Sequence, residues 1–501
     1  MASAKLNRRL SFHDAVFLHW ERRNQPMHVG ECMVYDGHFT RDELLELLDA
    51  RLHLIPRYRQ RVVPSPLRLS YPTWEDDPDF ALDRHVEEVT MPAPGDDRVL
   101  SRFGGKLFSQ TLDRSHPLWK LSVIRGHQSG NTILFMRLHH SMVDGVSAVA
   151  LVDVLHGDDP ADNGTPKPHV PWEPQPMPGT LRLLGDALVD RVGAAAETLK
   201  EGAGLMRPSA AVAQLRDLSV LVRTWGRSLP NAVVPAPKTP WNHHISSDRE
   251  FAWLELPFEE ARGVKGTLGG TVNDLILTVL AGGLGRYLRR NGYTTDGVQL
   301  RAMVPVSMRR PGQEGPTGNV VSLVVVPLHV GVQDPVERLR LEREAMERAK
   351  AEDQASGIYQ MIQMSRRVPP PLHELQWRMS RTSTRWPVNI VSTNLPGPKV
   401  PLYLAGRKML HWYPLGVPWT TLGLFLCTLS YDQRLVLGLV ADPNLVPDIW
   451  DVVDDLRDSY DEMRETARSL APSPRARRTA RPKAVPAAKA KANASKAGGP
   501  A

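Results

Sequence analysis

The spacing of apolar positions along the chain changes between the two-residue period of a strand and the 3.6-residue period of a helix. Short apolar runs, such as NTILFMRLHH at 131–140 and EFAWLEL at 250–256, predict buried strands. Apolar side chains recur at helical spacing through RDELLELLDARLHL at 41–54 and TVNDLILTVLAGGLGRYLRR at 271–290. Because strand and helix segments alternate in both halves of the chain, the pattern predicts an α/β protein.

A proline-rich stretch divides this pattern into two parts. Residues 158–179 contain seven prolines and no periodic apolar positions, which is typical of a linker or a surface crossover. Helical spacing at 180–228 predicts a helical pair packed on the protein, with a membrane surface as the alternative location. Two α/β lobes imply a cleft between them, where ligands commonly bind. The expected units are an N-terminal lobe at 1–158, a linker and helical crossover at 159–248, a C-terminal lobe at 249–470 and a tail at 471–501.

Turn and capping residues predict where several elements of the C-terminal lobe begin and end. The YDQR centre of TLGLFLCTLSYDQRLVLGLVAD, at 421–442, predicts a hairpin turn between two strands. Asp334 and Pro335 predict the start of a charged helix, with the aspartate as N-cap and the proline at the first helical position. A closing helix is expected from about residue 447 to about residue 469.

The net charge of +7 is concentrated at the end of the 501-residue chain. Residues 471–501 carry eight of the 62 Lys and Arg side chains and none of the 55 Asp and Glu, so the rest of the chain is close to neutral. A Pro/Ala/Lys-rich tail buries too little apolar surface to fold, so we expect it to be solvated and disordered. A loose electrostatic tether to anionic lipid or nucleic acid is the alternative role for this tail. The neutral body gives no reason to expect nucleic-acid binding.

Cysteine usage and hydropathy indicate the compartment. Cys32 and Cys427 are far apart in sequence, so neither a disulfide framework nor a cysteine-based zinc site is predicted, and we expect a reducing cytoplasm. The longest apolar runs, SLVVVPLHV and TLGLFLCTL, are shorter than the roughly 18 residues that a membrane-spanning helix needs. Contact with the inner membrane face or with lipid inclusions is therefore expected to be peripheral.

The stretch LHHSMVDG at 138–145 is the main candidate for chemistry. It lies where the predicted strand at 131–140 ends and a helix begins, and the chain contains no GxSxG, GxxxxGK[ST] or HExxH motif. If the strand reaches His140, His139 and His140 point to opposite faces, so at most one of them is catalytic. A structural alternative is a capping box from Ser141 to Asp144, which leaves the histidine pair unexplained. A metal site has little support, because no further ligand stands at suitable spacing.

A histidine at the end of a strand is suited to general-base catalysis. Its ordinary pKa of about 6.5 lets it take a proton from an alcohol, amine or thiol that attacks an acyl group, which contributes roughly 10² to 10⁴ in rate. No covalent acyl-enzyme is then required. Asp144 is a candidate for orienting the loop and the imidazole.

The motif resembles the HHxxxDG of the bacterial wax ester synthase/diacylglycerol acyltransferase family, within the superfamily of CoA-dependent acyltransferases and condensation domains. The resemblance extends in family order over about residues 8 to 465. It includes LSFHDAVFLHWE, FALDRHVEEVTMPAPG, the PLW of LDRSHPLWKLSVIRG, the ND pair of TVNDLILTVLAGGL, VPVSMR, Gly318-Asn319 and NLPGP at 394–398.

This resemblance implies a two-lobed, chloramphenicol acetyltransferase-like α/β fold with a substrate tunnel between the lobes. It implies that His140 is the general base, that His139 supports the site, and that Asp144 and Gly145 shape the loop. Long-chain acyl-CoA is the implied co-substrate, with no cofactor or metal, and the acceptor is a diacylglycerol or a fatty alcohol. The products are triacylglycerol or wax ester and CoA. The elements that look structural in the family are Pro117, Leu118 and Trp119 together with Asn273 and Asp274.

Two positions leave alternatives open. Thr271 and Asp274 have capping-box spacing, which puts Asn273 in the first helical turn, but its amide could instead contact the substrate or a developing oxyanion. His243 and His244 stand where relatives are expected to have a Gly/Pro turn, and they are interpreted as a surface loop or as the acceptor entrance.

Four rival functions are compatible with parts of the pattern. The HxxxD element would also serve an amide-forming condensation enzyme or a short-chain acetyltransferase, against which the PLW, ND and NLPGP segments argue. From another class, a non-catalytic lipid-binding protein of neutral-lipid inclusions predicts acyl-chain binding without turnover. A nucleic-acid-binding protein would depend on the tail and on salt concentration.

Overall fold

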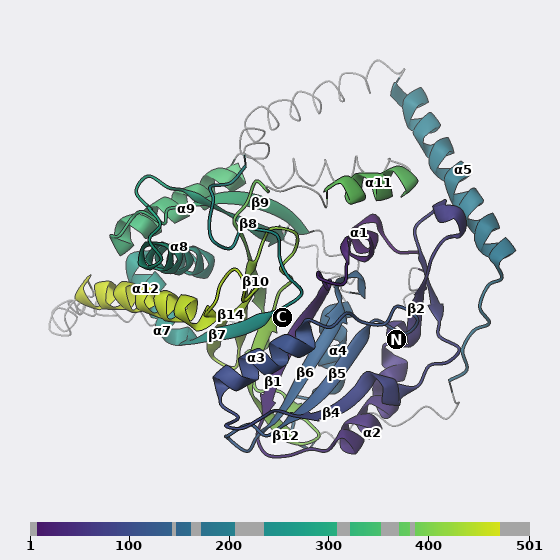
Figure 1. Cartoon of the computed structure of the whole chain (residues 1–501), viewed down its shortest axis with the longest axis horizontal. Coiled ribbons are helices and arrows are strands. Elements are labelled where there is room, and N and C mark those ends of the chain that lie inside the picture. Colours follow the sequence, from purple (N-terminus) through teal and green to yellow (C-terminus); the bar gives the residue numbers. More distant parts are fainter. Residues whose placement is uncertain are drawn as a thin grey trace, which may run out of the picture.

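Two six-stranded sheets form the framework of the protein, with helices packed around them (Figure 1). The structure is a computed structural model that describes residues 8–142, 147–161, 172–205, 235–307, 321–351, 370–380 and 386–470. Within these ranges, strands and helices alternate in both halves of the chain, as the apolar spacing predicts. The basic tail at 471–501 lies outside the described residues.

The first sheet carries the HH stretch near its centre. Its strand order is β11-β12-β1-β6-β5-β4, and every residue of β6 is buried because both faces of the sheet are covered. Leucines of α2 and α4 cover one face, and α3 covers the other together with residues of the second sheet. The elements of this lobe are α1 (Phe12–Trp20), β1 (His28–Tyr35), α2 (Arg41–Arg51), β2 (Gln60–Val63), β3 (Thr73–Asp76), β4 (Val86–Thr90), α3 (Asp97–Phe108), β5 (Trp119–Arg125), β6 (Thr132–His139) and α4 (Ser147–Leu155).

Two strands of this sheet come from the other half of the chain, which the lobe boundaries expected from sequence did not anticipate. β11 (Tyr403–Leu404) and β12 (Arg407–Leu415) join the first sheet, where β12 pairs antiparallel with β1. The pairing covers an edge of β1 that would otherwise expose unpaired backbone groups. Gly438 in β14 of the second sheet allows β12 to approach closely, because a Cβ at this position would stand 2.0 Å from the carbonyl oxygen of Pro414.

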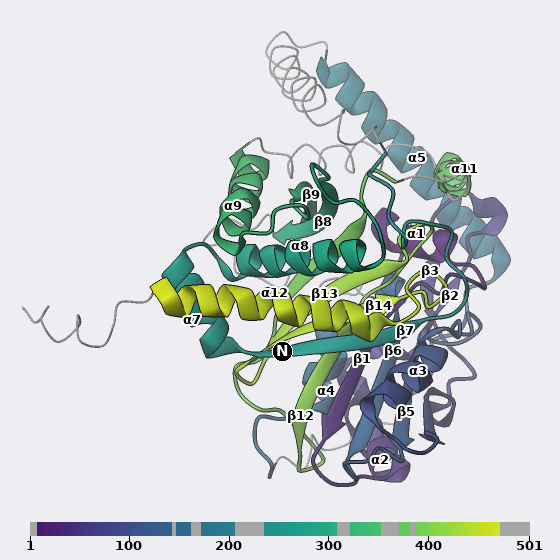
Figure 2. The same ribbon diagram turned by 60° about the vertical axis from the view of Figure 1, so that its left-hand side comes forward.

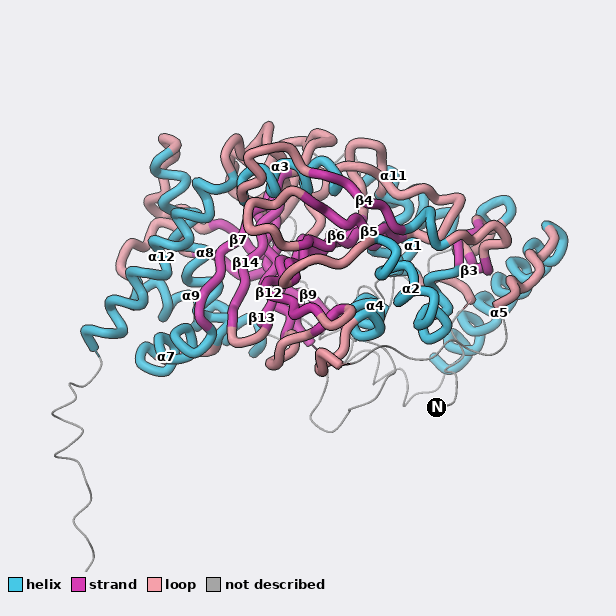
Figure 3. The backbone as a smooth tube through the Cα atoms, turned by 90° about the horizontal axis from the view of Figure 1, so that it is seen from below, coloured by secondary structure: helices cyan, strands magenta, loops and turns pink. Residues whose placement is uncertain are grey.

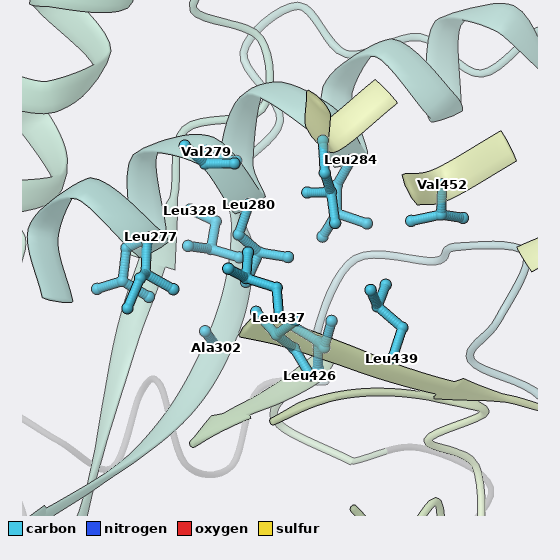
Figure 4. Packing of buried hydrophobic residues seen from close by; sticks show 14 of the residues in the cluster. Leu277, Val279, Leu280, Leu284, Ala302, Leu328, Leu426, Leu437, Leu439 and Val452 are labelled. Carbon is cyan, nitrogen blue, oxygen red and sulfur yellow. The ribbon is translucent and has the colours of Figure 1, made fainter. Parts of the chain in front are cut away.

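The second sheet, with strand order β7-β14-β13-β10-β8-β9, packs against a layer of helices (Figure 2). Leu277, Leu280 and Leu284 of α8 point toward Leu426 and Leu437 of the sheet (Figure 4). The elements are β7 (Glu250–Pro257), α7 (Phe258–Leu268), α8 (Val272–Arg290), β8 (Leu300–Ser307), β9 (Val321–Leu328), α9 (Pro335–Ala351), α11 (Pro370–Ser380), β10 (Ile390–Pro396), β13 (Leu424–Tyr431), β14 (Arg434–Ala441) and α12 (Ile449–Leu470).

The turn and cap predictions for this half are confirmed. β13 and β14 are joined at Asp432 and Gln433, whose φ angles of 39° and 63° are those of a tight hairpin turn. Asp334 caps α9, accepting a hydrogen bond of 2.7 Å from the backbone N–H of Glu337. The closing helix is α12, which begins at Ile449 and ends at Leu470.

The helical crossover is described only in part. The linker residues 172–179 form no helix or strand, α5 (Thr180–Leu205) follows them, and residues 206–234 lie outside the described ranges. α5 lies at the edge of the molecule, at the opposite end from α12 (Figure 3). Ion pairs from Arg8 to Asp186 and from Arg9 to Asp190 attach it to the N-terminal lobe.

No single helix in the described part of the chain is long and apolar enough to cross a membrane. One pair of helices, α7 and α8, passes a test of length and composition when taken together, with a bend of 92° between them. α8 is mostly buried against the second sheet and α12, as expected for a core helix.

Candidate active site

The two histidines of LHHSMVDG lie where β6 ends. β6 includes His139 as its last residue, and His140 begins a 3-10 turn that extends to Met142. The backbone N–H of His140 donates a hydrogen bond of 2.8 Å to the carbonyl of Met27, immediately before β1. The strand therefore stops one residue earlier than the sequence suggested, and the two rings have different neighbours.

The imidazole of His140 lies against α1. It stacks on the ring of Phe17, with centroids 3.7 Å apart and planes inclined by 13°. Burial lowers the pKa of His140 to about 4, and the nearby His139 ring contributes in the same direction. The ring is therefore neutral near pH 7 and can accept a proton.

The imidazole of His139 is completely buried and has a defined orientation. Its Nδ1 accepts a hydrogen bond of 3.1 Å from the backbone N–H of Ser141, and the Ser141 hydroxyl lies 2.7 Å from the same atom. These contacts place the proton of the neutral ring on Nε2, which lies 3.4 Å from Oε1 of Glu21. Ser141 thus orients His139, whatever its relation to Asp144.

Glu21, at the end of α1, is a buried carboxylate with several partners. Arg114 contacts its Oε2 at 2.7 Å, and the backbone N–H of Met27 donates to its Oε1 at 3.3 Å. Burial raises the pKa of this carboxyl, but His139 and Arg114 together lower it further, so that the pKa of Glu21 is about 2. α1 therefore places the ring of Phe17 against His140, and its C-cap residue, Glu21, places a carboxylate next to His139.

The PLW segment is part of the core. Trp119 is buried, donates from its indole N–H to the carbonyl of Tyr58 at 2.8 Å, and stacks on His85. The carbonyl of Leu118 accepts a hydrogen bond of 2.9 Å from the backbone N–H of His139. Pro117, Leu118 and Trp119 are all buried, and through this bond the segment also fixes the end of β6.

The ND pair begins α8 with the predicted capping box. Thr271 accepts from the backbone N–H of Asp274, and Asp274 accepts from the backbone N–H of Thr271. Asn273 is half-buried in the first turn of the helix. The capping role of Asp274 accounts for its position without a substrate.

The other residues singled out from sequence fall into two groups. Asp144 and Gly145 lie outside the described residues. His243 and His244 are both exposed in the loop before β7, which agrees with the surface-loop interpretation. In the part of the chain that the structure describes, no three His, Cys, Asp or Glu side chains are grouped so that they could hold a metal ion.

An apolar face of the second sheet turns away from α8. Leu424 and Leu426 of β13 pack toward α8, so the alternate residues Phe425 and Cys427 point to the opposite face. Trp419 packs against this face and stacks on Trp20 of α1, with ring centroids 6.4 Å apart. Because Trp20 follows Phe17 by three residues on one helix, α1 connects this apolar face to His140.

Sequence reasoning missed Phe17 and Glu21. Both belong to the stretch LSFHDAVFLHWE, and their i, i+4 spacing puts them on one side of a helix. That spacing could have indicated a shared role, but only the folded chain brings the helix against the end of β6.

The chain matches one family along most of its length. Residues 10–276 match the model of the wax ester synthase/diacylglycerol acyltransferase catalytic domain, and residues 317–464 match that of the WS/DGAT C-terminal domain. A putative diacylglycerol O-acyltransferase of Mycobacterium tuberculosis is 31% identical over 480 residues, which cover 93% of this chain and 98% of the relative. A probable diacylglycerol O-acyltransferase of the same organism is 28% identical over 452 residues, covering 89% and 93%.

Solved structures agree with this match. The wax ester synthase/diacylglycerol acyltransferase from Marinobacter aquaeolei has a TM-score of 0.64 and 25% identity, with 92% of this chain and 99% of that chain covered. The first condensation domain of the calcium-dependent antibiotic synthetase has a TM-score of 0.57 at 13% identity, covering 94% and 98%, and shows the shared fold alone. The expected acyltransferase-type α/β fold is confirmed.

Proposed function

The chain belongs to the wax ester synthase/diacylglycerol acyltransferase family and is an acyltransferase, and on this premise we propose its reaction and its catalytic base. The enzyme transfers a long-chain acyl group from acyl-CoA to the hydroxyl of a diacylglycerol, and also of a fatty alcohol. His140 acts as the general base, and no acyl-enzyme forms.

In the proposed reaction, His140 takes one proton from the acceptor hydroxyl and later gives it to the leaving group. The acceptor hydroxyl gives its proton to His140 as its oxygen attacks the thioester carbonyl, forming a tetrahedral intermediate. When this intermediate collapses, the carbon–sulfur bond breaks and the CoA sulfur receives the proton from the imidazolium. The products are the ester and CoA, and the imidazole returns to its neutral form.

The observation that carries this proposal is the neutral His140 ring held on Phe17. A pKa of about 4 keeps the ring unprotonated before the reaction, and it makes the imidazolium a strong acid toward the leaving thiolate. His139, Ser141 and Glu21 support this assignment as positioning residues, since their contacts orient the chain on which His140 lies.

We also propose where the acyl chain lies. We place it along the apolar face of the second sheet that includes Phe425 and Cys427, because that face is connected to His140 through α1. Burying methylene groups there stabilises the bound chain by about 0.8 kcal/mol each. Long-chain acyl-CoA is therefore the expected donor.

The direct test is an assay of purified protein with labelled palmitoyl-CoA and either dioleoylglycerol or hexadecanol. We expect CoA release and labelled ester to form in equal amounts, in the presence of acceptor only. A reaction without acceptor is the control for thioester hydrolysis. Binding of the acyl chain without any CoA release would instead support the alternative of a non-catalytic lipid-binding protein.

The pH dependence of kcat/KM gives a second prediction. Because the pKa of His140 is lowered from 6.5 to about 4, its neutral form predominates from about pH 5 upward. We expect kcat/KM to be nearly constant between about pH 5 and about pH 8. A base with the ordinary pKa of 6.5 would lose roughly 30-fold over that range as the pH falls. Circular dichroism at each pH checks that the protein stays folded.

A further inference from the structure

Three tryptophans from distant parts of the sequence form one cluster beside α1. Trp20 lies on α1, Trp386 precedes β10, and Trp419 lies in the loop between β12 and β13. Their ring centroids form a closed triangle with sides of 6.0, 6.4 and 6.4 Å. Each ring is partly exposed, so the cluster is not an ordinary core packing of aromatic side chains.

All three indole N–H groups of this tryptophan cluster are buried and have no hydrogen-bond partner among the described residues. A buried donor left unsatisfied costs about 1 to 3 kcal/mol, and folded proteins keep few of them. Other indole N–H groups of this chain do have partners: those of Trp119, Trp241 and Trp412 each donate a hydrogen bond to an oxygen of the protein. Unpaired donors gathered in one place indicate a ligand that supplies acceptor oxygens.

The loop that presents Trp419 has a strained residue and is tied to the rest of the protein by hydrogen bonds. Thr420 has a φ of 49°, an uncommon conformation for a β-branched residue. Its backbone N–H donates a hydrogen bond of 2.8 Å to the side chain of Gln25, and its carbonyl accepts from the N–H of Ile245. The Thr420 hydroxyl, which follows Trp419 in the sequence, is also buried without a hydrogen-bond partner among the described residues.

The tryptophan cluster lies close to the proposed base. Trp20 follows Phe17 by three residues on α1, so their Cβ atoms are about 5 to 6 Å apart. Phe17 stacks on His140. His140 and the tryptophan cluster therefore contact side chains that lie one helical turn apart on α1.

We propose that the tryptophan cluster is the subsite that binds the ester oxygens of the acceptor, and that it makes the enzyme select glycerides over plain alcohols. In a 1,2-diacylglycerol, the carbon adjacent to the hydroxyl-bearing carbon carries an ester. The carbonyl oxygen of this ester accepts a hydrogen bond from an indole N–H. A fatty alcohol has only methylene groups there and leaves the donors unpaired. This inference rests on the proposed function, because it assumes an acceptor hydroxyl at His140.

The test compares two acceptors in variants that lose the donor but keep an aromatic ring. Trp20→Phe, Trp386→Phe and Trp419→Phe are assayed with palmitoyl-CoA and with either dioleoylglycerol or hexadecanol. We expect the ratio of kcat/KM for dioleoylglycerol to that for hexadecanol to fall by about threefold to tenfold in each variant, mainly through KM for the glyceride. Three separate variants keep the test usable if one of them does not fold.

Trp450→Phe is the matched control. Trp450, in the first turn of α12, also has a buried indole N–H without a partner among the described residues. Its ring packs on Trp253, and its substitution is expected to leave both rates unchanged. An unchanged acceptor ratio in all folded cluster variants would overturn the proposal. An equal loss of kcat with both acceptors would also overturn it, because the donors would then act on the thioester oxygen that both reactions share.

Binding without acyl-CoA separates this inference from the proposed reaction. Dioleoylglycerol in detergent micelles is titrated into wild type and variants, and intrinsic fluorescence reports binding. If wild type forms no ester, the proposed function fails, while weaker glyceride binding in the Trp→Phe variants alone still supports the subsite. Equal glyceride binding by wild type and variants overturns the subsite independently of turnover.

Discussion

His140→Ala is expected to lower turnover by at least about 10² while the protein remains folded, since a general base contributes on that scale. The substitution removes the only group proposed to take the hydroxyl proton, whereas its packing loss is limited to one half-buried ring stacked on Phe17. kcat with palmitoyl-CoA and dioleoylglycerol measures the effect, and thermal unfolding checks the fold. His139→Ala is expected to lower turnover less, because its proposed role is positioning.

His243→Ala is the matched control for this experiment. It removes another imidazole, but an exposed one in the loop before β7, and we expect wild-type turnover and stability. Near wild-type turnover of folded His140→Ala would show that another group is the base. If His140→Ala unfolds, its loss of turnover does not report on the base. His140→Gln, which keeps a polar side chain of similar length, is therefore measured in parallel.

Glu21→Gln is expected to cost about 1 to 3 kcal/mol of unfolding free energy, because it weakens the hydrogen bonds that a buried, charged carboxylate accepts from its partners. The carboxylate contacts Arg114 at 2.7 Å and lies 3.4 Å from His139. Turnover is expected to fall as well, since His139 loses the group that faces its Nε2. Denaturant unfolding and kcat measure the two effects.

The pH dependence of this destabilisation has a definite sign. The pKa of Glu21 in the folded protein, about 2, lies below its ordinary value of 4.5. Its contribution is therefore present in full above about pH 5 and decreases as the pH falls toward 2, so wild type and Glu21→Gln should converge in acid.

Glu347→Gln is the control for the loss of a carboxylate paired with arginine. Glu347 pairs with Arg343 on the surface of α9, where both side chains are at least half exposed. Exposed pairs contribute about 0 to 1 kcal/mol, so little change in stability is expected. If Glu21→Gln were as mild as this control, the buried contacts around Glu21 would not support the site.

Helix α1 connects the separate parts of the proposed mechanism. Two of its side chains and its C-cap residue face different partners: Phe17 lies on His140, Trp20 belongs to the tryptophan cluster, and the C-cap Glu21 faces His139. Because one helix contacts the proposed base, His139 and the proposed acceptor subsite, we expect acceptor binding and the position of the imidazole to be coupled. Changes in α1 are therefore expected to affect acceptor choice and turnover together.

Local patterns in the sequence determined most individual elements. The alternating and helical periods predicted the strands and helices, and the hairpin at Asp432 and the cap at Asp334 followed from turn and capping chemistry. The capping box of Thr271 and Asp274 was also evident, because its two residues are neighbours in the same helical turn. Such features depend on residues a few positions apart, which a single sequence displays directly.

Partners distant in sequence were decided only by the tertiary structure. β12 completes the first sheet although it follows β1 by more than half of the chain, and an apolar strand pattern does not specify which edge it will pair with. The tryptophan cluster joins residues 20, 386 and 419 in the same way.

The sequence by itself determined the α/β class, the position of the histidine pair at a strand end, and the family that the motifs resemble. The tertiary structure alone decided that His139 faces a buried carboxylate while His140 lies on an aromatic ring. The physical reason is that burial and neighbouring charges shift a pKa through groups that are close in space, and here those groups come from α1, far from β6 along the chain.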